Sequence, residues 1–240
     1  LSGFDEEHQL SLQVIRENML KNHGYYKVTE DGVEQCLISC DDGVYRFTPP
    51  ESEEQDWTVE KLVDEAASDA VLVDLDQDGE KELILISPFH GEHIYFYKKI
   101  DGDYKKVYTY DTADFAHAIY GGTLLGKPAV IIGHRKGERN LLLFTWEQEK
   151  GQYQVEILDR DCGPANVFKY ERGTEEVLIS TNREIDEVAM YTFESRWEEM
   201  QMLEQLKKKC MRRICCFQNT DLSLLPGEMS AGSTERADCL

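Results

Sequence analysis

Short apolar segments alternate with polar turns through most of the 240-residue chain, and one layout recurs four times. In each repeat a strongly apolar segment ends in Ser or Gly, and these ends fall at residues 39, 87, 133 and 180, a period of about 47 residues. The apolar segments span residues 35–39, 82–87, 129–133 and 176–180. A Gly-containing turn precedes each one, so we interpret them as the second strands of four similar units.

A third strand follows every apolar segment, and a fourth strand follows in three of the repeats. The third strands are predicted over residues 44–47, 93–97, 141–144 and 188–191, and the fourth over 57–59, 106–109 and 153–157. Four short antiparallel strands in each unit are typical of a propeller blade. We therefore predict an all-β fold, a β-propeller, with four-stranded blades at about residues 20–65, 66–112, 113–160 and 161–194.

Both ends of this array predict an incomplete ring. Residues 9–15 alternate apolar and polar positions, so we expect residues 1–19 to hold the outer strand of a preceding blade. The fourth repeat has no outer strand of its own, which is either missing or supplied by residues 9–15. The four blades are expected to belong to a larger ring of about seven or eight, completed by missing N-terminal blades or by a second copy.

The pattern changes after Phe193. Ser195 and Glu198 have the spacing of a capping box, and apolar residues then recur at helical intervals. This predicts a C-terminal α-helix over residues 195–216, whose basic end suits the negative end of the helix dipole. Residues 217–240 are rich in Ser, Gly, Pro and Glu, which predicts a disordered tail.

Charge and cysteine content narrow the classes of partner and compartment. The chain has 26 Lys and Arg against 47 Asp and Glu, a net charge of −21, which repels nucleic acid and anionic membranes. No apolar run approaches the roughly 18–20 residues that span a bilayer, so no membrane is expected as a partner. Seven cysteines with irregular spacing predict free thiols in a reducing compartment, and hence a cytoplasmic location.

An acidic loop joins the first and second strands of the second repeat. Asp74, Asp76 and Asp78 alternate along it, and Gly79 permits a sharp turn. Carboxylates in this pattern converge on a hard cation when the loop curls. The alternative is an acidic turn closed by its own hydrogen bonds, and either role is structural.

Most histidines map to the opposite face of the predicted propeller. His23 and His117 occupy the same repeat position, where a blade enters its innermost strand, and His90 lies in the loop between the second and third strands. We predict these three at the channel mouth, as metal ligands or as catalytic acid and base groups. On the same face we predict substrate-binding residues, namely His134, Arg135, Asn182, Arg183 and Tyr25.

The acidic loop resembles the calcium-binding hairpin of FG-GAP and VCBS repeats. The resemblance implies that Asp74, Asp76, Asp78 and Glu82 bind Ca²⁺ through side chains and Glu80 through its carbonyl. Residues about 20–193 also resemble the C-terminal part of an uncharacterised family of bacterial VCBS-like propellers. The resembling stretches are residues 22–25, 40–45 with 48–50, 88–91, 163–167 and 180–184.

Two functions agree with this pattern. The first is a non-catalytic propeller that presents its His- and Arg-rich face to a glycan, a small molecule or a protein, with calcium in the acidic loop. The second is a carbohydrate-active propeller of the lyase or dehydratase type. It is implied by a more distant similarity to propeller enzymes that act on sugars, such as aldos-2-ulose dehydratases and some polysaccharide lyases, which place His and metal at the channel mouth. The metal-dependent form of the second requires a shared metal site, which fails if His23, His90 and His117 lie more than about 12 Å apart.

Overall fold

A computed structural model describes residues 12–52, 54–193 and 214–215, and its strands form four four-stranded antiparallel sheets. The first sheet contains β1 (Tyr25–Glu30), β2 (Val33–Cys40), β3 (Gly43–Thr48) and β4 (Thr58–Val63). The second contains β5 (Asp69–Val73), β6 (Glu82–Ser87), β7 (His93–Ile100) and β8 (Asp103–Tyr110). The third contains β9 (Ala116–Leu124), β10 (Lys127–His134), β11 (Leu141–Glu147) and β12 (Gln152–Asp159). The fourth contains β13 (Pro164–Arg172), β14 (Glu175–Asn182), β15 (Glu187–Thr192) and β16 (Ile214–Cys215).

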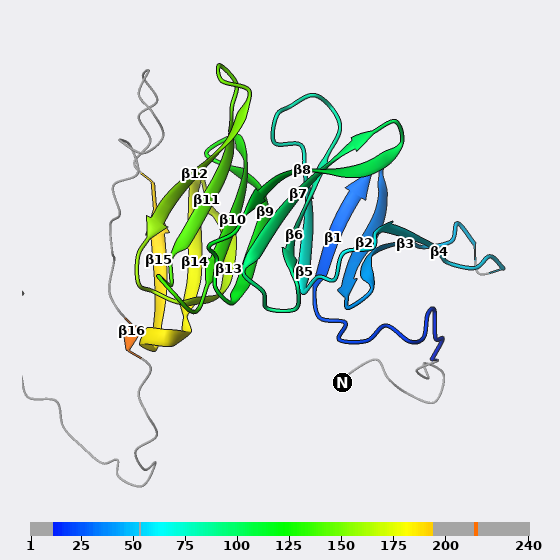
Figure 1. Cartoon of the computed structure of the whole chain (residues 1–240), viewed down its shortest axis with the longest axis horizontal. Coiled ribbons are helices and arrows are strands. Elements are labelled where there is room, and N and C mark those ends of the chain that lie inside the picture. The colour runs from blue at the N-terminus through cyan, green and yellow to red at the C-terminus, as the bar shows by residue number, and fades with distance from the viewer. Residues whose placement is uncertain (1–11, 53, 194–213, 216–240) are drawn as a thin grey trace, which may run out of the picture.

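The sheets follow one another in chain order like the blades of a propeller, with the first sheet at one end of the array and the fourth at the other (Figure 1). Every second and third strand expected from the sequence is present, and so are the three fourth strands. Two-residue turns with positive φ at both positions close several hairpins, for example Asp31 (50°) with Gly32 (79°). Such turns match the twist of the strands they join, and this explains why the Gly-containing turns mark the repeat so clearly.

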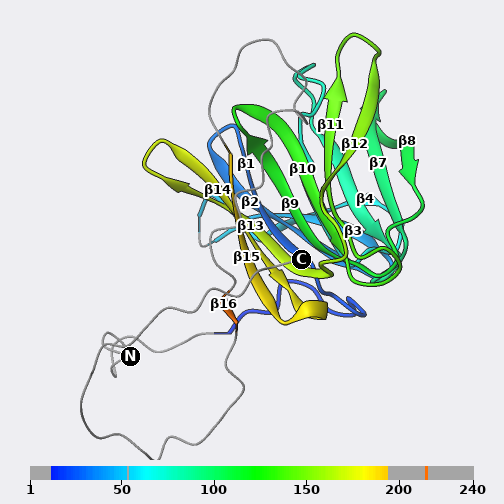
Figure 2. The same ribbon diagram turned by 90° about the vertical axis from the view of Figure 1, so that its left-hand side faces the viewer.

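Apolar faces pack between consecutive sheets. Leu37 of the first sheet shares a cluster with Leu85 of the second, and Phe96 of the second shares another with Phe144 of the third. A third cluster joins the third and fourth sheets. Figure 2 shows these sheets edge-on, with β7 and β8 beside β11 and β12. Alternate side chains of each strand point to opposite faces, so a central blade buries both faces.

The first strand of each sheet lies nearest the centre. β5 contacts both β1 and β9, and β9 contacts β13. The Tyr26 hydroxyl donates a hydrogen bond to the Gly121 carbonyl at 3.0 Å, which links the first sheet to the third. At Gly121 a Cβ atom would lie 2.8 Å from Val71, so only glycine permits this approach of β9 to β5. These central strands form the wall from which the candidate site is built.

The ends of the chain differ from expectation where the structure describes them. The helix predicted over residues 195–216 is wrong at Ile214–Cys215, which pair with Val188 and Glu187 as strand β16. This pairing supplies the outer strand that the fourth repeat lacked. The rest of that helix, and the predicted tail, lie outside the described residues. Residues 12–15 form no strand, so the predicted preceding-blade strand is wrong there, and residues 9–11 are outside the described part.

The described residues contain one 3₁₀ turn, Arg183–Ile185, and no helix long and apolar enough to cross a membrane. Three cysteines within them, Cys36, Cys40 and Cys162, form no disulfide.

Candidate functional site

Three histidines from three different sheets meet at one end of the central strands. His23 precedes β1, His90 lies in the loop between β6 and β7, and His117 belongs to β9. One ring nitrogen from each lies within 4.8 Å of the others, and Nε2 of His23 is 3.4 Å from Nε2 of His90. The structure therefore brings together the three residues that the repeat positions singled out. We refer to them as the histidine triad.

Two members of the triad are held from behind by hydrogen-bond acceptors. Nδ1 of His23 lies 3.1 Å from Oδ2 of Asp69, the first residue of β5. Nδ1 of His117 lies 2.8 Å from the carbonyl oxygen of Ala165 on β13. A carbonyl or an ionised carboxylate only accepts, so each Nδ1 donates and each neutral ring keeps a lone pair on Nε2. Metal-binding histidines are oriented by the same kind of outer partner.

His90 reaches the triad through an unusual backbone conformation. Its φ is 50°, in the left-handed region, and Gly91 closes the preceding turn with a hydrogen bond to the Pro88 carbonyl at 2.8 Å. Phe115, two residues before His117, also has positive φ, at 57°. A bulky residue rarely adopts this conformation, and such conformations cluster at functional sites.

The surroundings of His90 and His117 favour the neutral forms of these two side chains. Burial lowers the pKa of His90 to about 4, with further lowering from His117, His23 and Arg135. Burial also lowers the pKa of His117. Burial raises the pKa of Asp69 to about 6, against the opposing effect of His23. Neutral imidazoles offer lone pairs to a metal ion at neutral pH.

The His90 pKa predicts how stability depends on pH. Its folded value lies below the ordinary 6.5, so the unfolded chain binds more protons and stability falls as pH decreases from about 6.5 to about 4. Asp69 acts in the opposite direction over an overlapping window because its folded pKa is raised. Comparison with His90→Gln isolates the histidine: urea unfolding of the metal-free variant should lose less stability between pH 7 and about pH 4.5 than the parent. Equal losses would contradict this.

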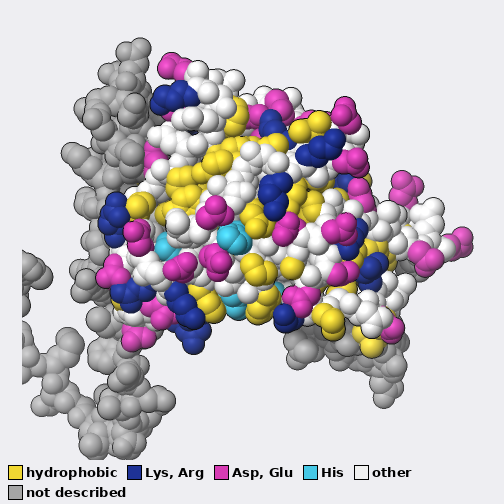
Figure 3. All heavy atoms as spheres, viewed as in Figure 1, with side chains coloured by type: hydrophobic (Ala, Val, Ile, Leu, Met, Phe, Trp, Pro, Cys, Tyr) yellow, Lys and Arg dark blue, Asp and Glu magenta, His cyan; other side chains and the backbone are white. Residues whose placement is uncertain are grey.

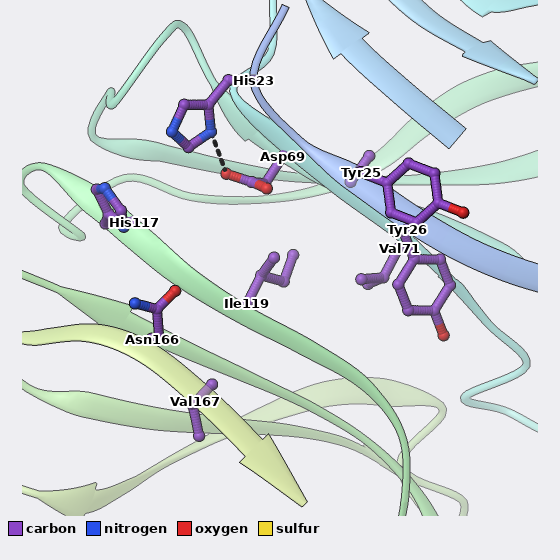
Figure 4. A pocket seen from close by; sticks show the side chains of 10 residues that line it. His23, Tyr25, Tyr26, Asp69, Val71, His117, Ile119, Asn166 and Val167 are labelled. Carbon is purple, nitrogen blue, oxygen red and sulfur yellow. Dashed lines mark hydrogen bonds and ion pairs between the residues drawn. The ribbon is translucent and has the colours of Figure 1, made fainter. Parts of the chain in front are cut away.

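A cavity of about 190 Å³ opens beside the triad. His23 and His117 line one end, and Tyr25 and Tyr26 line the other (Figure 4). In Figure 4 Asn166 lies on the side of β13 that faces His117. The cavity is therefore bounded by all four central strands, with ring nitrogens at one end and aromatic rings at the other.

The predicted substrate-binding residues divide into two groups. His134 and Asn182 are buried and bonded internally: His134 accepts the Asn140 N–H at 3.1 Å through Nε2, and Asn182 donates to Glu187 at 2.9 Å. Arg135, Arg183 and Tyr25 are closer to the expectation. Tyr25 is 68% exposed at the cavity, and the positive charges of Arg135 and Arg183 act on the pKa of His117.

The acidic loop also brings carboxylates together as a cation site does, but the Lys98 ammonium contacts the same oxygens. Oxygens of Asp74, Asp76 and Asp78 lie within 4.8 Å of one another. The Lys98 ammonium on β7 donates to Asp76 and, at 2.9 Å, to Asp78. It also lies 3.6 Å from the buried carboxylate of Glu82. The donor set suits a hard cation such as Ca²⁺, but a cation must displace Lys98 from the same oxygens.

Hydrogen bonds within the loop hold it closed as well. Asp74 accepts the backbone N–H groups of Asp78 and Gly79, both at 3.1 Å. Glu82 accepts the Leu75 N–H at 2.8 Å, and burial raises its pKa to about 7. Glu80 is exposed. The turn closed by its own hydrogen bonds, one of the two alternatives from the sequence, is therefore present.

Removing the competing ammonium should reveal whether the loop binds calcium. Lys98→Met leaves the carboxylates uncompensated, so we expect the free energy of unfolding to fall by about 1–3 kcal/mol. Millimolar Ca²⁺ should restore that loss in the variant and have less effect on the parent, measured by urea unfolding. Lys105→Met, an exposed change on β8, is the control and should alter neither value. A Ca²⁺ response equal in all three proteins would contradict this assignment.

Two important residues were not expected from the sequence. Asp69, which orients His23, stands in an ordinary strand, and no spacing distinguishes it from the other 46 acidic residues. Lys98 belongs to the third strand of its repeat, and only the paired hairpin brings it onto the acidic loop. The repeat does hold one usable signal: Asp69 and Tyr25 are the first residues of central strands, and His117 is the second residue of β9.

Comparison with known proteins supports the fold alone. No protein-family model matches the sequence, and no curated protein matches it. A solved structure from Bacteroides uniformis, described as a "putative 6-phosphogluconolactonase", has a TM-score of 0.53 and 12% identity, covering 81% of this chain and 55% of that one. A protein of the same description from Bacteroides fragilis has a TM-score of 0.52 and 16% identity, covering 80% and 53%. The chain thus spans about half the length of these structures, and it has a β-propeller fold.

Proposed function

We propose that the protein is a metal-dependent β-propeller that binds one divalent transition-metal ion through His23, His90 and His117. The spacing of the ring nitrogens carries this proposal. Tetrahedral zinc, with metal–nitrogen bonds of about 2.0–2.1 Å, holds its ligand nitrogens about 3.3 Å apart. The 3.4 Å between the Nε2 atoms of His23 and His90 agrees with this geometry.

Three protein ligands leave a coordination position open, as in catalytic rather than structural zinc sites. The cavity next to His23 and His117 gives a small molecule access to that position. A metal ion there supplies Lewis-acid polarisation of a ligand oxygen or an activated water. We therefore favour an enzyme of the lyase or dehydratase type that acts on a sugar-like ligand. The aromatic ring of Tyr25, which lines the cavity, can contact the ring of that ligand.

A second function retains a specific observation in its favour. The convergence of Asp74, Asp76 and Asp78 supports an FG-GAP- or VCBS-like hairpin, and so a binding module for a glycan or protein. In that case calcium in the loop stabilises the second blade. We further propose that the four blades belong to a larger ring, since the chain matches about half the length of the two solved propellers.

Metal titration tests the main proposal. We expect one Zn²⁺ or Co²⁺ per chain by calorimetry, with affinity that weakens in acid as protons compete for imidazole. Asp69→Asn should lower the affinity about 10–100-fold, because it removes the carboxylate that orients His23. Asp103→Asn, an exposed carboxylate on β8, is the matched control and should bind like the parent. Stoichiometric Ca²⁺ binding without any transition metal would favour the second function instead.

A further inference from the structure

Positive side chains surround the histidine triad although the chain is strongly acidic. Two phenylalanine rings flank the triad: Phe89 stacks on His90 at 4.1 Å between centroids, and Phe115 lies 4.9 Å from His90. Lysine and arginine groups lie over the same two rings. Lys21 is 6.0 Å from the Phe89 ring, and Arg135 and Lys136 are 5.0 Å and 4.9 Å from the Phe115 ring.

A fourth cation, Arg183, follows a strand end that pairs next to the hydrogen-bond partner of His117. Arg183 follows Asn182, and Asn182 pairs with Pro164 of the neighbouring strand. Ala165, which follows Pro164, accepts the hydrogen bond from His117. The positive charge of Arg183 helps to lower the pKa of His117. Figure 3 shows histidines at the surface with basic side chains nearby, on a face that also carries acidic groups.

Carboxylates neutralise only part of this positive charge. Arg135 forms a two-point ion pair with Glu184, through contacts of 2.9 Å and 2.6 Å, and Lys21 pairs with Asp41 at 2.9 Å. Within the described part of the chain, no carboxylate forms an ion pair with Lys136 or Arg183. Both are exposed. The ion pair with Glu184 thus holds the Arg135 side chain in place, while Lys136 and Arg183 remain available to an incoming anion.

The strained backbone has a role in this arrangement. The carbonyl oxygen of Phe115, a residue with φ of 57°, accepts the Arg135 N–H at 3.0 Å, and the adjacent Asp114 carbonyl accepts the Lys136 N–H at 3.0 Å. The segment that precedes His117 therefore also fixes the backbone of Arg135 and Lys136. A conformation of this cost persists only where the surrounding structure maintains it.

We infer that the ligand of the open metal position is an oxyanion, the carboxylate or phosphate of a small molecule, bound between the triad metal and the side chains of Arg183 and Lys136. This inference rests on the proposed metal site. Arginine binds both oxyanions through paired N–H groups, and lysine contributes a point charge. In a chain of net charge −21, a local cationic rim also concentrates an anion that the rest of the surface repels.

Anion titration of the metal-loaded protein tests the inference. The full chain is loaded with Co²⁺, its metal content is measured, and the visible spectrum is followed while inorganic phosphate or acetate is added. We expect the spectrum to change with either or both anions, and the stronger of the two identifies the source. Arg183→Gln and Lys136→Gln should each weaken anion binding about tenfold while keeping full metal content. Arg172→Gln, an exposed arginine at the far turn of the fourth sheet, should bind like the parent.

The outcomes separate the two proposals. Full metal content with no anion response, or with responses unchanged in Arg183→Gln and Lys136→Gln, overturns the oxyanion inference and leaves the metal site in place. Failure of the parent protein to bind metal overturns both. A weakened response in Arg172→Gln equal to that in Arg183→Gln would indicate general charge screening rather than a site, and would also overturn the inference.

Discussion

Replacing His117 with alanine is expected to abolish stoichiometric binding of a transition metal. Loss of an outer partner costs about 10–100-fold in metal affinity, and loss of a ligand should exceed that upper limit. The Ala165 carbonyl fixes the tautomer and the orientation of His117. The imidazoles of His23 and His90 then remain, and they must bind the metal ion without a third protein ligand.

Calorimetry with Zn²⁺, at pH 7 and constant salt, measures this loss. His93→Ala is the matched control, since His93 begins β7, pairs with Asp111 at 2.9 Å and takes no part in the triad. Both variants should be melted without metal first, because His117→Ala also loses a hydrogen bond worth about 1 kcal/mol. Metal affinity in His117→Ala equal to that in His93→Ala would refute the triad as a metal site.

The repeat is the part of this fold that sequence reasoning predicts well. Strands with period-two alternation and Gly-containing turns recur at one interval, so an error in one unit is corrected by the other three. The same logic brought His23 and His117 together, since equal repeat positions lie at equal places around the ring. Strand β16 could not be predicted in this way, because a strand of two residues has no periodicity of its own.

Strand ends show why the site itself is harder to predict. His134 and Arg135 are neighbours at the end of β10, yet His134 is 1% exposed while Arg135 extends over the Phe115 ring. At the end of β14, Asn182 is likewise buried and its neighbour Arg183 is exposed. Because successive side chains of a strand face opposite sides, a shift of one residue in the strand end exchanges interior and surface. The sequence identifies the loop but not which of its residues faces the ligand.

Replacing Phe96 with alanine is expected to lower the free energy of unfolding by about 3–5 kcal/mol. Phe96 on β7 is fully buried, and its ring contacts Phe144 at 5.3 Å, Tyr153 at 4.7 Å and Tyr108 at 5.2 Å between centroids. Phe144 and Tyr153 belong to the third sheet, so this one side chain joins two blades. Alanine removes the ring and leaves a cavity that the surrounding strands fill only in part.

Phe168→Ala is the matched control, because this phenylalanine on β13 is 56% exposed and its truncation should change the free energy of unfolding by about 0.5 kcal/mol or less. Urea unfolding of both variants measures the difference, and similar values would mean that the Phe96 contacts contribute little. The Phe96 interface also joins the sheets that carry His90 and His117, so loosening it should weaken metal binding as well. By linkage, a metal that binds only the folded chain must recover part of the lost stability. A metal-induced rise in Tm that is smaller in Phe96→Ala than in the parent, and absent from His117→Ala, would connect the packing of the blades to the site between them.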